Sequence, residues 1–193
     1  MSNVKIEGNA SGTGTFTIAA PNSNTDRTLT LPDEAGTVLT SASSITQNAG
    51  PAFFAYRNSD YSLTDNVVTK LPLGLELFDT DSCYDTSNSR FTPNVEGYYF
   101  VEALVYIAAQ TIYDADVWLY KNGSNFIHLG SLYSADFLPN DIGTLGSSTL
   151  VYMNGTTDYL EVYVRIDNDG CCNRILNSNN YSPRFSGFLA RSV

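Results

Sequence analysis

The chain has 193 residues, of which 42% are hydrophobic and 16% are charged, and its net charge at pH 7 is −10. This length suits one ordinary domain with a smaller appendage. Nucleic acid is excluded as an expected partner, because phosphate contacts depend on Lys and Arg, and these are outnumbered 10 to 20 by acidic residues. No apolar stretch has the length of a membrane-spanning helix, so we expect no membrane insertion.

The composition favours strands and turns over helices. The 13 Tyr, 10 Phe and many Thr residues suit a pleated sheet, whereas the abundant Asn, Gly and Ser suit turns. The opening residues MSNVKIEGNASG lack the apolar core of a signal peptide. Cys83, Cys171 and Cys172 fit neither a disulfide framework nor a zinc site, so we expect free thiols and synthesis in a reducing cytoplasm.

Residues 1–45 form a small, polar, Thr-rich segment that contains two short alternating runs. Phe16 and Ile18 share one face of the first run, and Leu29 and Leu31 share one face of the second. The turn-forming sequence PNSNTDR separates them. Because these runs carry too few apolar residues for a core of their own, we expect a β-rich stalk or anchoring segment that needs partners. A floppy polar leader is the alternative.

A linker is predicted over residues 46–51, and a larger domain over residues 52–193. Apolar density rises in this domain, and turn signals such as KNGS and MNGTTD separate short apolar runs. Asn-Gly between such runs favours a β-hairpin. Many short strands without helical periodicity are typical of a sandwich or barrel. The predicted strands cover residues 52–57, 66–73, 90–93, 97–109, 114–123, 126–134, 143–153, 158–166 and 184–191.

The longest predicted strand, GYYFVEALVYIAA at 97–109, is apolar on both faces. Alternate residues of a strand point to opposite faces, so neither face can meet water along its length. One face is expected to fill the core, and a neighbouring subunit is expected to cover the other, with a single large core as the alternative. The residues predicted for the subunit interface or the core strand are Tyr98, Tyr99, Phe100, Val101, Leu104, Tyr106, Phe185 and Phe188.

Residues 52–193 resemble the C1q-like family, the tumour-necrosis-factor-like jelly rolls of complement globular heads. The resemblance rests on Asp79, Tyr84, Phe91, Gly97 and Tyr99, on the closing strand RFSGFLA, and on WLYKNGS and DYLEVYVR. The chain departs from the family at Leu73, Val101 and Ala103, where aromatic residues are usual, so its core must pack differently there. The resemblance implies an all-β, ten-strand-type jelly-roll sandwich that forms a tight homotrimer.

The stretch GTGTFTIAAPNSNTDRTLTLPDEAGTVLT, within residues 8–40, resembles a segment in structural proteins of tailed phages, particularly marine and cyanobacterial ones. That segment typically precedes a receptor-binding or fibre-tip domain. The two resemblances imply a trimeric fibre or spike in a virion, anchored to capsid or tail proteins through Phe16, Ile18, Leu29 and Leu31. The alternatives are a capsid-decorating head fibre or tail adaptor with a purely structural role and, third, a polysaccharide depolymerase.

The sequence carries no recognisable enzyme motif, so we expect a non-enzymatic protein. It lacks a Gly-x-Ser-x-Gly elbow, a phosphate-binding Gly loop and a His-rich metal motif. His128 is the single histidine, and its place within an alternating strand favours a structural role.

Calcium is the candidate cofactor, although none is certain from the sequence. Asp79, Asp81 and Asp85 crowd one loop, and Asp167 and Asp169 crowd another. Carboxylate oxygens are the donors that calcium prefers. Solvated loop acids without a metal are the alternative.

Contacts to a host receptor or glycan are expected on loops, because a rigid scaffold presents its binding residues there. The candidate loops are residues 79–90, 132–141 and 167–182. Their aromatic residues are predicted to stack on sugars, with internal packing as the alternative. These residues are Tyr84, Tyr133, Phe137 and Tyr181.

Overall fold

The computed structural model describes residues 50–107, 112–133, 143–167 and 182–193, the backbone of 174–176, and short exposed pieces between residues 11 and 28. The chain divides into two compact units, Met1–Ile45 and Thr46–Val193. The predicted anchoring residues of the first unit lie outside the described residues, so their role stays a prediction. They are Phe16, Ile18, Leu29 and Leu31.

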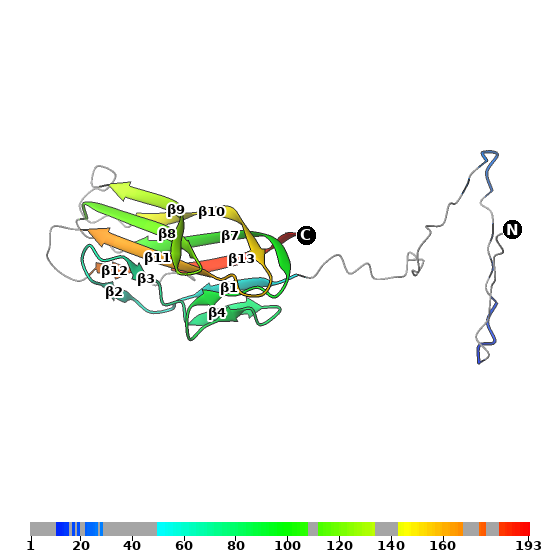
Figure 1. The fold of residues 1–193 in the computed structure, drawn as a ribbon, viewed down its shortest axis with the longest axis horizontal. Coiled ribbons are helices and arrows are strands. Elements are labelled where there is room, and N and C mark those ends of the chain that lie inside the picture. Colours follow the sequence, from blue (N-terminus) through cyan, green and yellow to red (C-terminus); the bar gives the residue numbers. More distant parts are fainter. Residues whose placement is uncertain are drawn as a thin grey trace. The chain divides into compact units, whose positions relative to one another are not determined.

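The described part of the second unit is an all-β sandwich of two antiparallel sheets (Figure 1). Sheet A contains β1 (Ala52–Tyr56), β2 (Tyr61–Leu63), β4 (Leu75–Asp79), β7 (Glu96–Ile107), β10 (Gly143–Asn154), β12 (Arg174–Leu176) and β13 (Arg184–Ser192). Sheet B contains β3 (Thr69–Lys70), β5 (Tyr84–Asp85), β6 (Arg90–Phe91), β8 (Asp114–Lys121), β9 (Ser124–Tyr133) and β11 (Leu160–Asp167). Across sheet A, β7 pairs with β10 on one side and with β13 on the other, and β1 and then β4 follow β13.

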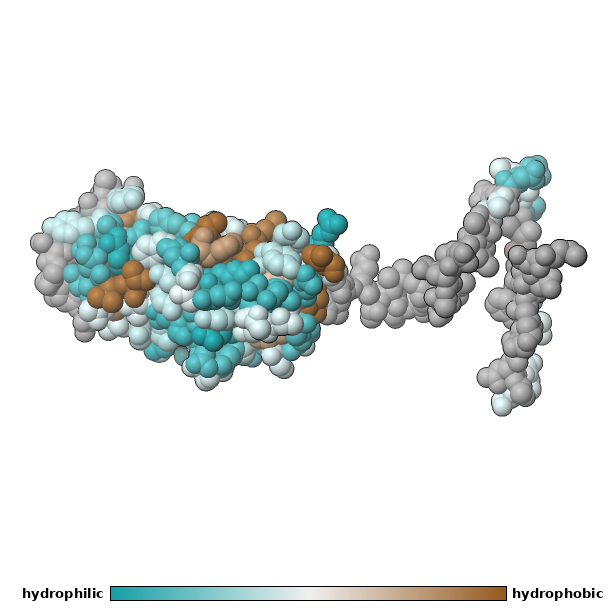
Figure 2. Space-filling model, viewed as in Figure 1, coloured by the Kyte–Doolittle hydropathy of each residue, from teal (hydrophilic) through white to brown (hydrophobic). Residues whose placement is uncertain are grey.

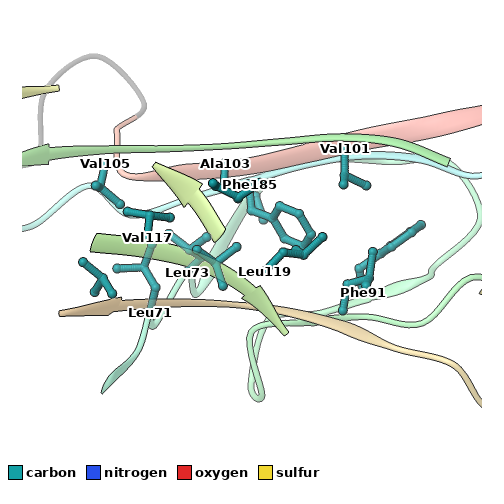
Figure 3. Packing of buried hydrophobic residues seen from close by; sticks show 14 of the residues in the cluster. Leu71, Leu73, Phe91, Val101, Ala103, Val105, Val117, Leu119 and Phe185 are labelled. Atoms are coloured by element: carbon teal, nitrogen blue, oxygen red, sulfur yellow. The ribbon is translucent and has the colours of Figure 1, made fainter. Parts of the chain in front are cut away.

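The predicted alternation of β7 is confirmed. Its inward residues, from Tyr99 to Ile107, are at most 1% exposed, whereas Tyr98 on the other face is 47% exposed. The inward face packs between the sheets against Val117 and Leu119 of β8 and Leu71 and Leu73 before β4 (Figure 3).

Aromatic rings form the centre of this core. The Phe53 ring lies 4.2 Å from Phe91, 4.9 Å from Phe185 and 5.3 Å from Tyr84, measured between ring centroids. Phe91 also contacts Tyr99 edge to face at 5.5 Å. The core therefore keeps an aromatic cluster although position 101 carries Val.

The structure corrects the predicted strand at 66–73. Only Thr69 and Lys70 pair in a sheet, as β3 against β11. Asn66 has a φ of 53°, the left-handed region that a strand does not use. The structure also adds β2, β4, β5 and β12, which the sequence pattern did not predict.

The two Asn-Gly turns behave differently. Asn122 and Gly123, with φ of 54° and 77°, close the predicted tight hairpin between β8 and β9. The predicted hairpin at Asn154 does not form, because β10 belongs to sheet A and β11 to sheet B. There the Asn154 Oδ1 atom accepts hydrogen bonds from the backbone N–H groups of residues 156, 157 and 158, which turns the chain from one sheet to the other.

The sandwich has two distinct ends. Gly50, the first described residue of this unit, lies close to the starts of β1 and β7 and to the last residues of β13, and we call this the entry end. At the opposite end β7 stops at Ile107, β8 begins at Asp114 and β9 stops at Tyr133, and we call this the distal end. The candidate surfaces are placed relative to these two ends.

Candidate functional site

Hydrophobic side chains reach the surface of the second unit in several places (Figure 2), and one group lies on the outer face of sheet A. The register places Leu150, Phe100, Phe188 and Ala52 in one row across four strands. Leu150 is 60% exposed and Phe188 is 50% exposed. An exposed apolar group of this kind on a sheet face is typical of an interaction surface.

A second aromatic pair extends this surface towards the entry end. Tyr98 and Tyr152 lie opposite each other on β7 and β10, with ring centroids 5.6 Å apart, and both remain exposed. Towards the opposite edge of sheet A, the rings of Phe54 on β1 and Phe78 on β4 have centroids 6.3 Å apart. Aromatic side chains therefore occur on the outer face from the edge strand β10 to the edge strand β4.

One ion pair interrupts this apolar face. The Nε and Nη2 atoms of Arg184 donate to Oε1 of Glu102 at 3.0 and 2.8 Å. Both side chains are about one-third exposed. Because each charge is neutralised by its neighbour, the face stays compatible with burial against a partner.

The eight residues predicted for the interface or the core strand divide between the two sides of sheet A. Tyr99, Val101 and Phe185 are at most 1% exposed and belong to the core. The other five alternate with these core residues and lie on the outer face, exposed or half-buried: Tyr98, Phe100, Leu104, Tyr106 and Phe188. The outer face is therefore the candidate assembly surface.

The predicted receptor-binding residues do not form one cluster within the described part of the chain. Tyr133 is 59% exposed at the distal end, where it pairs with Asp114, and Tyr113 nearby is 49% exposed. Phe137 and Tyr181 lie outside the described residues. The distal end thus keeps one predicted contact residue in an accessible position.

The prediction for Tyr84 is wrong, because this residue belongs to the core. Its ring stacks on Phe53, and only 6% of the residue is exposed. Its hydroxyl donates to the Leu73 carbonyl at 3.1 Å, and burial raises the pKa of the phenol. A buried, hydrogen-bonded ring cannot stack on an external sugar.

The acidic loop predicted to bind calcium uses its carboxylates for its own turns. Asp79 accepts from the backbone N–H of Tyr84 at 2.8 Å, and Asp85 accepts from the N–H groups of Ser87 and Asn88. The side-chain hydrogen bonds of these last two residues lower the pKa of Asp85 to about 2. These carboxylates therefore stabilise the loop directly.

No set of three or more His, Cys, Asp or Glu residues suited to a metal ion occurs among the described residues. The structure therefore does not bring Asp79, Asp81 and Asp85 together as a set of three ligands. Asp167 lies at the distal end of β11, and its predicted companion Asp169 lies outside the described residues.

The outer face of sheet B carries a polar network that the sequence did not predict. Asp116 of β8 is only 8% exposed, and it accepts from Arg165 Nε at 3.1 Å and from the Ser131 hydroxyl at 2.7 Å. Burial alone would raise the pKa of Asp116, but these hydrogen bonds and the Arg165 charge outweigh it and lower the pKa. Asp116 is therefore held ionised by its partners.

His128, Ser131 and Asp116 lie together, but they do not form a nucleophile-activating triad. Asp116 Oδ1 lies 3.0 Å and Ser131 Oγ 3.1 Å from the same His128 atom, Nε2. A triad instead needs the carboxylate on one ring nitrogen and the hydroxyl on the other. The His128 ring also stacks on Trp118 at 5.4 Å, which fits the predicted structural role.

A second buried carboxylate on sheet B is also paired with cationic side chains. Glu161 is 2% exposed, and its Oε1 atom accepts from Lys70 at 3.2 Å and from Arg90 at 2.9 Å. The Arg90 guanidinium in turn lies 3.8 Å from the centre of the Tyr159 ring. Alternation in DADVWLYK and DYLEVYVR already places Asp116, Glu161 and Arg165 on the outer face. The pairing of Asp116 with Arg165 depends in addition on the register between the strands.

Two further features bear on the function. Cys83 is a free buried cysteine whose thiol pKa is raised chiefly by burial, and Cys171 and Cys172 lie outside the described residues. No helix within the described ranges has the length and apolarity needed to cross a membrane.

The fold is similar to several solved structures. The globular domain of zebrafish complement 1qA is 14% identical, with a TM-score of 0.55, over 74% of this chain and 99% of that chain. Eiger TNF from S. frugiperda is 10% identical, with a TM-score of 0.56, over 74% and 93% of the two chains. Murine APRIL is 11% identical, with a TM-score of 0.52, over 72% and 96%.

No protein-family model matches the sequence, and no curated protein matches it. At these identities the structural similarity concerns the fold alone. The second unit accordingly has the C1q/TNF-like jelly-roll fold.

Proposed function

We propose that the protein is a non-enzymatic, homotrimeric fibre or spike of a tailed-phage virion, with the jelly-roll unit as a tip that binds a host receptor or glycan. The observation that carries this proposal is the exposed aromatic outer face of sheet A, since on the outer face of sheet B the buried carboxylates of Asp116 and Glu161 are paired with cations. Three copies that pack around sheet A hide its apolar side chains and leave sheet B in water.

The two ends of the sandwich support the polarity of such a fibre. Gly50, which follows the predicted linker, lies at the entry end, whereas the exposed Tyr113 and Tyr133 lie at the distal end. The likeness of residues 8–40 to a tailed-phage segment supports attachment to capsid or tail proteins and a place in the virion.

Replacing Phe188 with Asp is expected to dissociate the assembly. The new carboxylate loses its water when the outer face of sheet A is covered, so association weakens by at least about tenfold. Light scattering coupled to gel filtration reports the change as a trimer that becomes a monomer.

Phe126→Asp is the matched control for this experiment. Phe126 on β9 is 48% exposed, against 50% for Phe188, so both variants add one carboxylate to a similarly exposed ring. The Phe126 variant is expected to remain trimeric. A monomeric wild-type protein at micromolar concentration contradicts the proposed assembly.

Replacing Tyr133 and Phe137 together with Ala is expected to weaken adsorption to host cells and to leave the trimer mass unchanged. An exposed aromatic ring at the distal end offers a flat apolar surface for sugar stacking, and truncation removes it. Competition between the purified protein and the phage for host cells measures the effect. Unchanged competition removes these two residues from the binding surface.

The position of the protein on the virion separates the proposed fibre tip from its structural alternatives. Antibodies raised against the jelly-roll unit are expected to mark the ends of fibres or spikes in electron micrographs. Labelling spread over the head favours a capsid-decorating fibre, and labelling within the tail favours an adaptor. Virions that carry no label contradict the proposal.

A further inference from the structure

Three ring-bearing side chains lie side by side across the outer face of sheet B. The register places Tyr163 of β11 opposite Trp118 of β8, and Trp118 opposite His128 of β9. We call these three residues the ring row. Neighbouring strands lie about 4.8 Å apart, so the row is about 10 Å long. A row of this length has room for two linked sugar rings.

Stacking holds the rings of this row in place. The Tyr163 ring stacks on Tyr120, with centroids 3.9 Å apart and planes 25° from parallel. The Trp118 ring stacks on His128 at 5.4 Å and 28°. His128 is exposed, and the other three residues are half-buried. A ring that is already immobilised loses little conformational entropy when a ligand covers it, so the row is preorganised for binding.

Polar side chains flank the ring row on both sides. Asp116 and Arg165 lie opposite each other on the distal side of the row, and Glu161 lies opposite Tyr120 on the entry side. The two carboxylates are buried and bound by cations, so their positions are fixed as well. Rings and charged hydrogen-bonding groups therefore follow one another along β8 and β11.

Three groups on this face have hydrogen-bonding capacity to spare. Within the described ranges, no group accepts a hydrogen bond from the Trp118 indole N–H, the Tyr120 hydroxyl or Arg90 Nη1. All three atoms reach solvent, because the single buried and unpartnered polar side-chain atom of the described residues is Ser182 Oγ. A ligand hydroxyl can therefore take the place of water on each of them.

The ion pairs of this face favour an uncharged ligand. They join three cations to three carboxylates: Lys70, Arg90 and Arg165 to Asp114, Asp116 and Glu161. A cationic ligand finds each of these carboxylates already bound by a cation. An anionic ligand meets cations that are already paired, and the net charge of −10 on the chain repels it.

We infer that the outer face of sheet B binds an uncharged oligosaccharide, with two sugar rings stacked along the ring row. A pyranose has apolar C–H faces and hydroxyl-bearing edges, and this chemistry matches flat rings flanked by hydrogen-bonding groups. The inference goes beyond the proposed function and does not depend on it. A single jelly-roll unit carries the whole row, so neither the trimer nor the distal residue Tyr133 is required.

Tryptophan fluorescence tests this site without a label, because Trp118 is the only tryptophan of the chain. The full-length protein is titrated with neutral hexasaccharides of glucose, mannose, galactose or N-acetylglucosamine, and with hexagalacturonate as an acidic probe. We expect a saturable change in emission with at least one neutral probe, and a weaker response or none with hexagalacturonate. The absence of a saturable change with every neutral probe, or tighter binding of hexagalacturonate, overturns the inference.

Tyr163→Ala removes one ring of the row and leaves the reporter in place, so it is expected to weaken binding of the same probe by about tenfold. Tyr163→Phe keeps the ring and is expected to bind as the wild type does, which separates stacking from an effect on folding. Phe126→Ala is the matched control, because it removes a ring that is 48% exposed on β9 and lies outside the row. It is expected to leave binding unchanged.

The distal double variant, Tyr133→Ala with Phe137→Ala, separates this site from the proposed function. Binding of the neutral probe is expected to survive in the double variant and to weaken in Tyr163→Ala. The reverse result assigns the sugar to the distal end, so it overturns the ring row as a site and leaves the proposed function intact. Equal weakening by Tyr163→Ala and Phe126→Ala also overturns the inference.

Discussion

Gly146→Ala is expected to destabilise the jelly-roll unit by more than about 3 kcal/mol. The φ of Gly146 is +149°, a region that L side chains rarely adopt. A Cβ atom at this position would lie 2.0 Å from the carbonyl oxygen of Ala103 and 2.9 Å from the Cα of Leu104. Both are backbone atoms of the paired strand, so β10 has to move away from β7.

The consequences extend beyond the strained residue. β10 supplies Leu145, Val151 and Met153 to the core, and each is at most 5% exposed. A displaced β10 exposes part of this apolar surface, and it also moves Leu150 on the outer face of sheet A. Urea unfolding at fixed protein concentration measures the loss, and hydrogen exchange identifies β10 as the strand that opens.

Gly74→Ala is the matched control, because a Cβ atom there meets only the Thr86 carbonyl oxygen, at an ordinary 3.8 Å. The same chemical change is expected to be neutral or to stabilise by less than about 1 kcal/mol. Equal unfolding free energies for the two variants contradict the close approach of β10 and β7 at Gly146.

The sequence predicted the features that repeat over many residues. Twelve residues of β7 alternate with a period of two, and this was sufficient to divide its residues between two faces, although not to say which face is the core. The hairpin at Asn122 was predictable for a related reason, since two residues determine the turn locally. At Asn154 the same dipeptide leads into a different sheet, because the side chain of Asn154 binds three successive N–H groups, and sequence spacing does not reveal this.

The predicted site residues failed where long-range packing decided their environment. Tyr84 lies in a stretch rich in Asp, Ser and Asn, which favours exposure. The short β5–β6 hairpin nevertheless turns its ring onto Phe53, 31 positions earlier in the sequence. The carboxylates of Asp79 and Asp85 are a local case, because backbone N–H groups within five positions along the chain engage them.

The network on sheet B was unpredictable for a third reason. Asp116 and Arg165 are 49 positions apart, and they meet only because β8 and β11 pair in the register that places them opposite each other. A shift of one residue in either strand would turn the side chain of that strand towards the core and separate the pair. The network therefore forms only in the observed register, and a shifted register would lose its ion pairs and hydrogen bonds.

Arg165→Leu is expected to destabilise the protein by about 3 kcal/mol at neutral pH, because it leaves a buried carboxylate without its cation. The Arg165 side chain is 24% exposed and the Asp116 side chain 11%, so solvent screens this pair only in part. Arg165 also donates to Asp114 and to Asn66, each at 2.8 Å, so the same substitution loosens the loop before β3. Urea unfolding of the variant and the wild type at several pH values measures the effect.

The pH dependence of this loss identifies its cause. In the wild type the pKa of Asp116 is lowered, so its stabilising contribution is present above the unfolded pKa of about 3.9 and is lost as the pH falls through the folded pKa. In the variant Arg165 no longer offsets the effect of burial on the pKa of Asp116, so the protonated carboxyl is favoured. The difference in unfolding free energy between the two proteins is therefore expected to shrink as the pH falls from about 7 to about 3.5.

Asp116→Asn in the Arg165→Leu background provides the deciding comparison. The amide keeps the shape of the carboxyl but carries no charge, so most of the stability lost through Arg165→Leu at neutral pH should return. Its unfolding free energy should also lack the pH dependence that Asp116 gives to the single variant. If the double variant is as unstable as Arg165→Leu at every pH, the loss comes from the contacts of Arg165 with Asp114 and Asn66, and the buried Asp116 charge is not its origin.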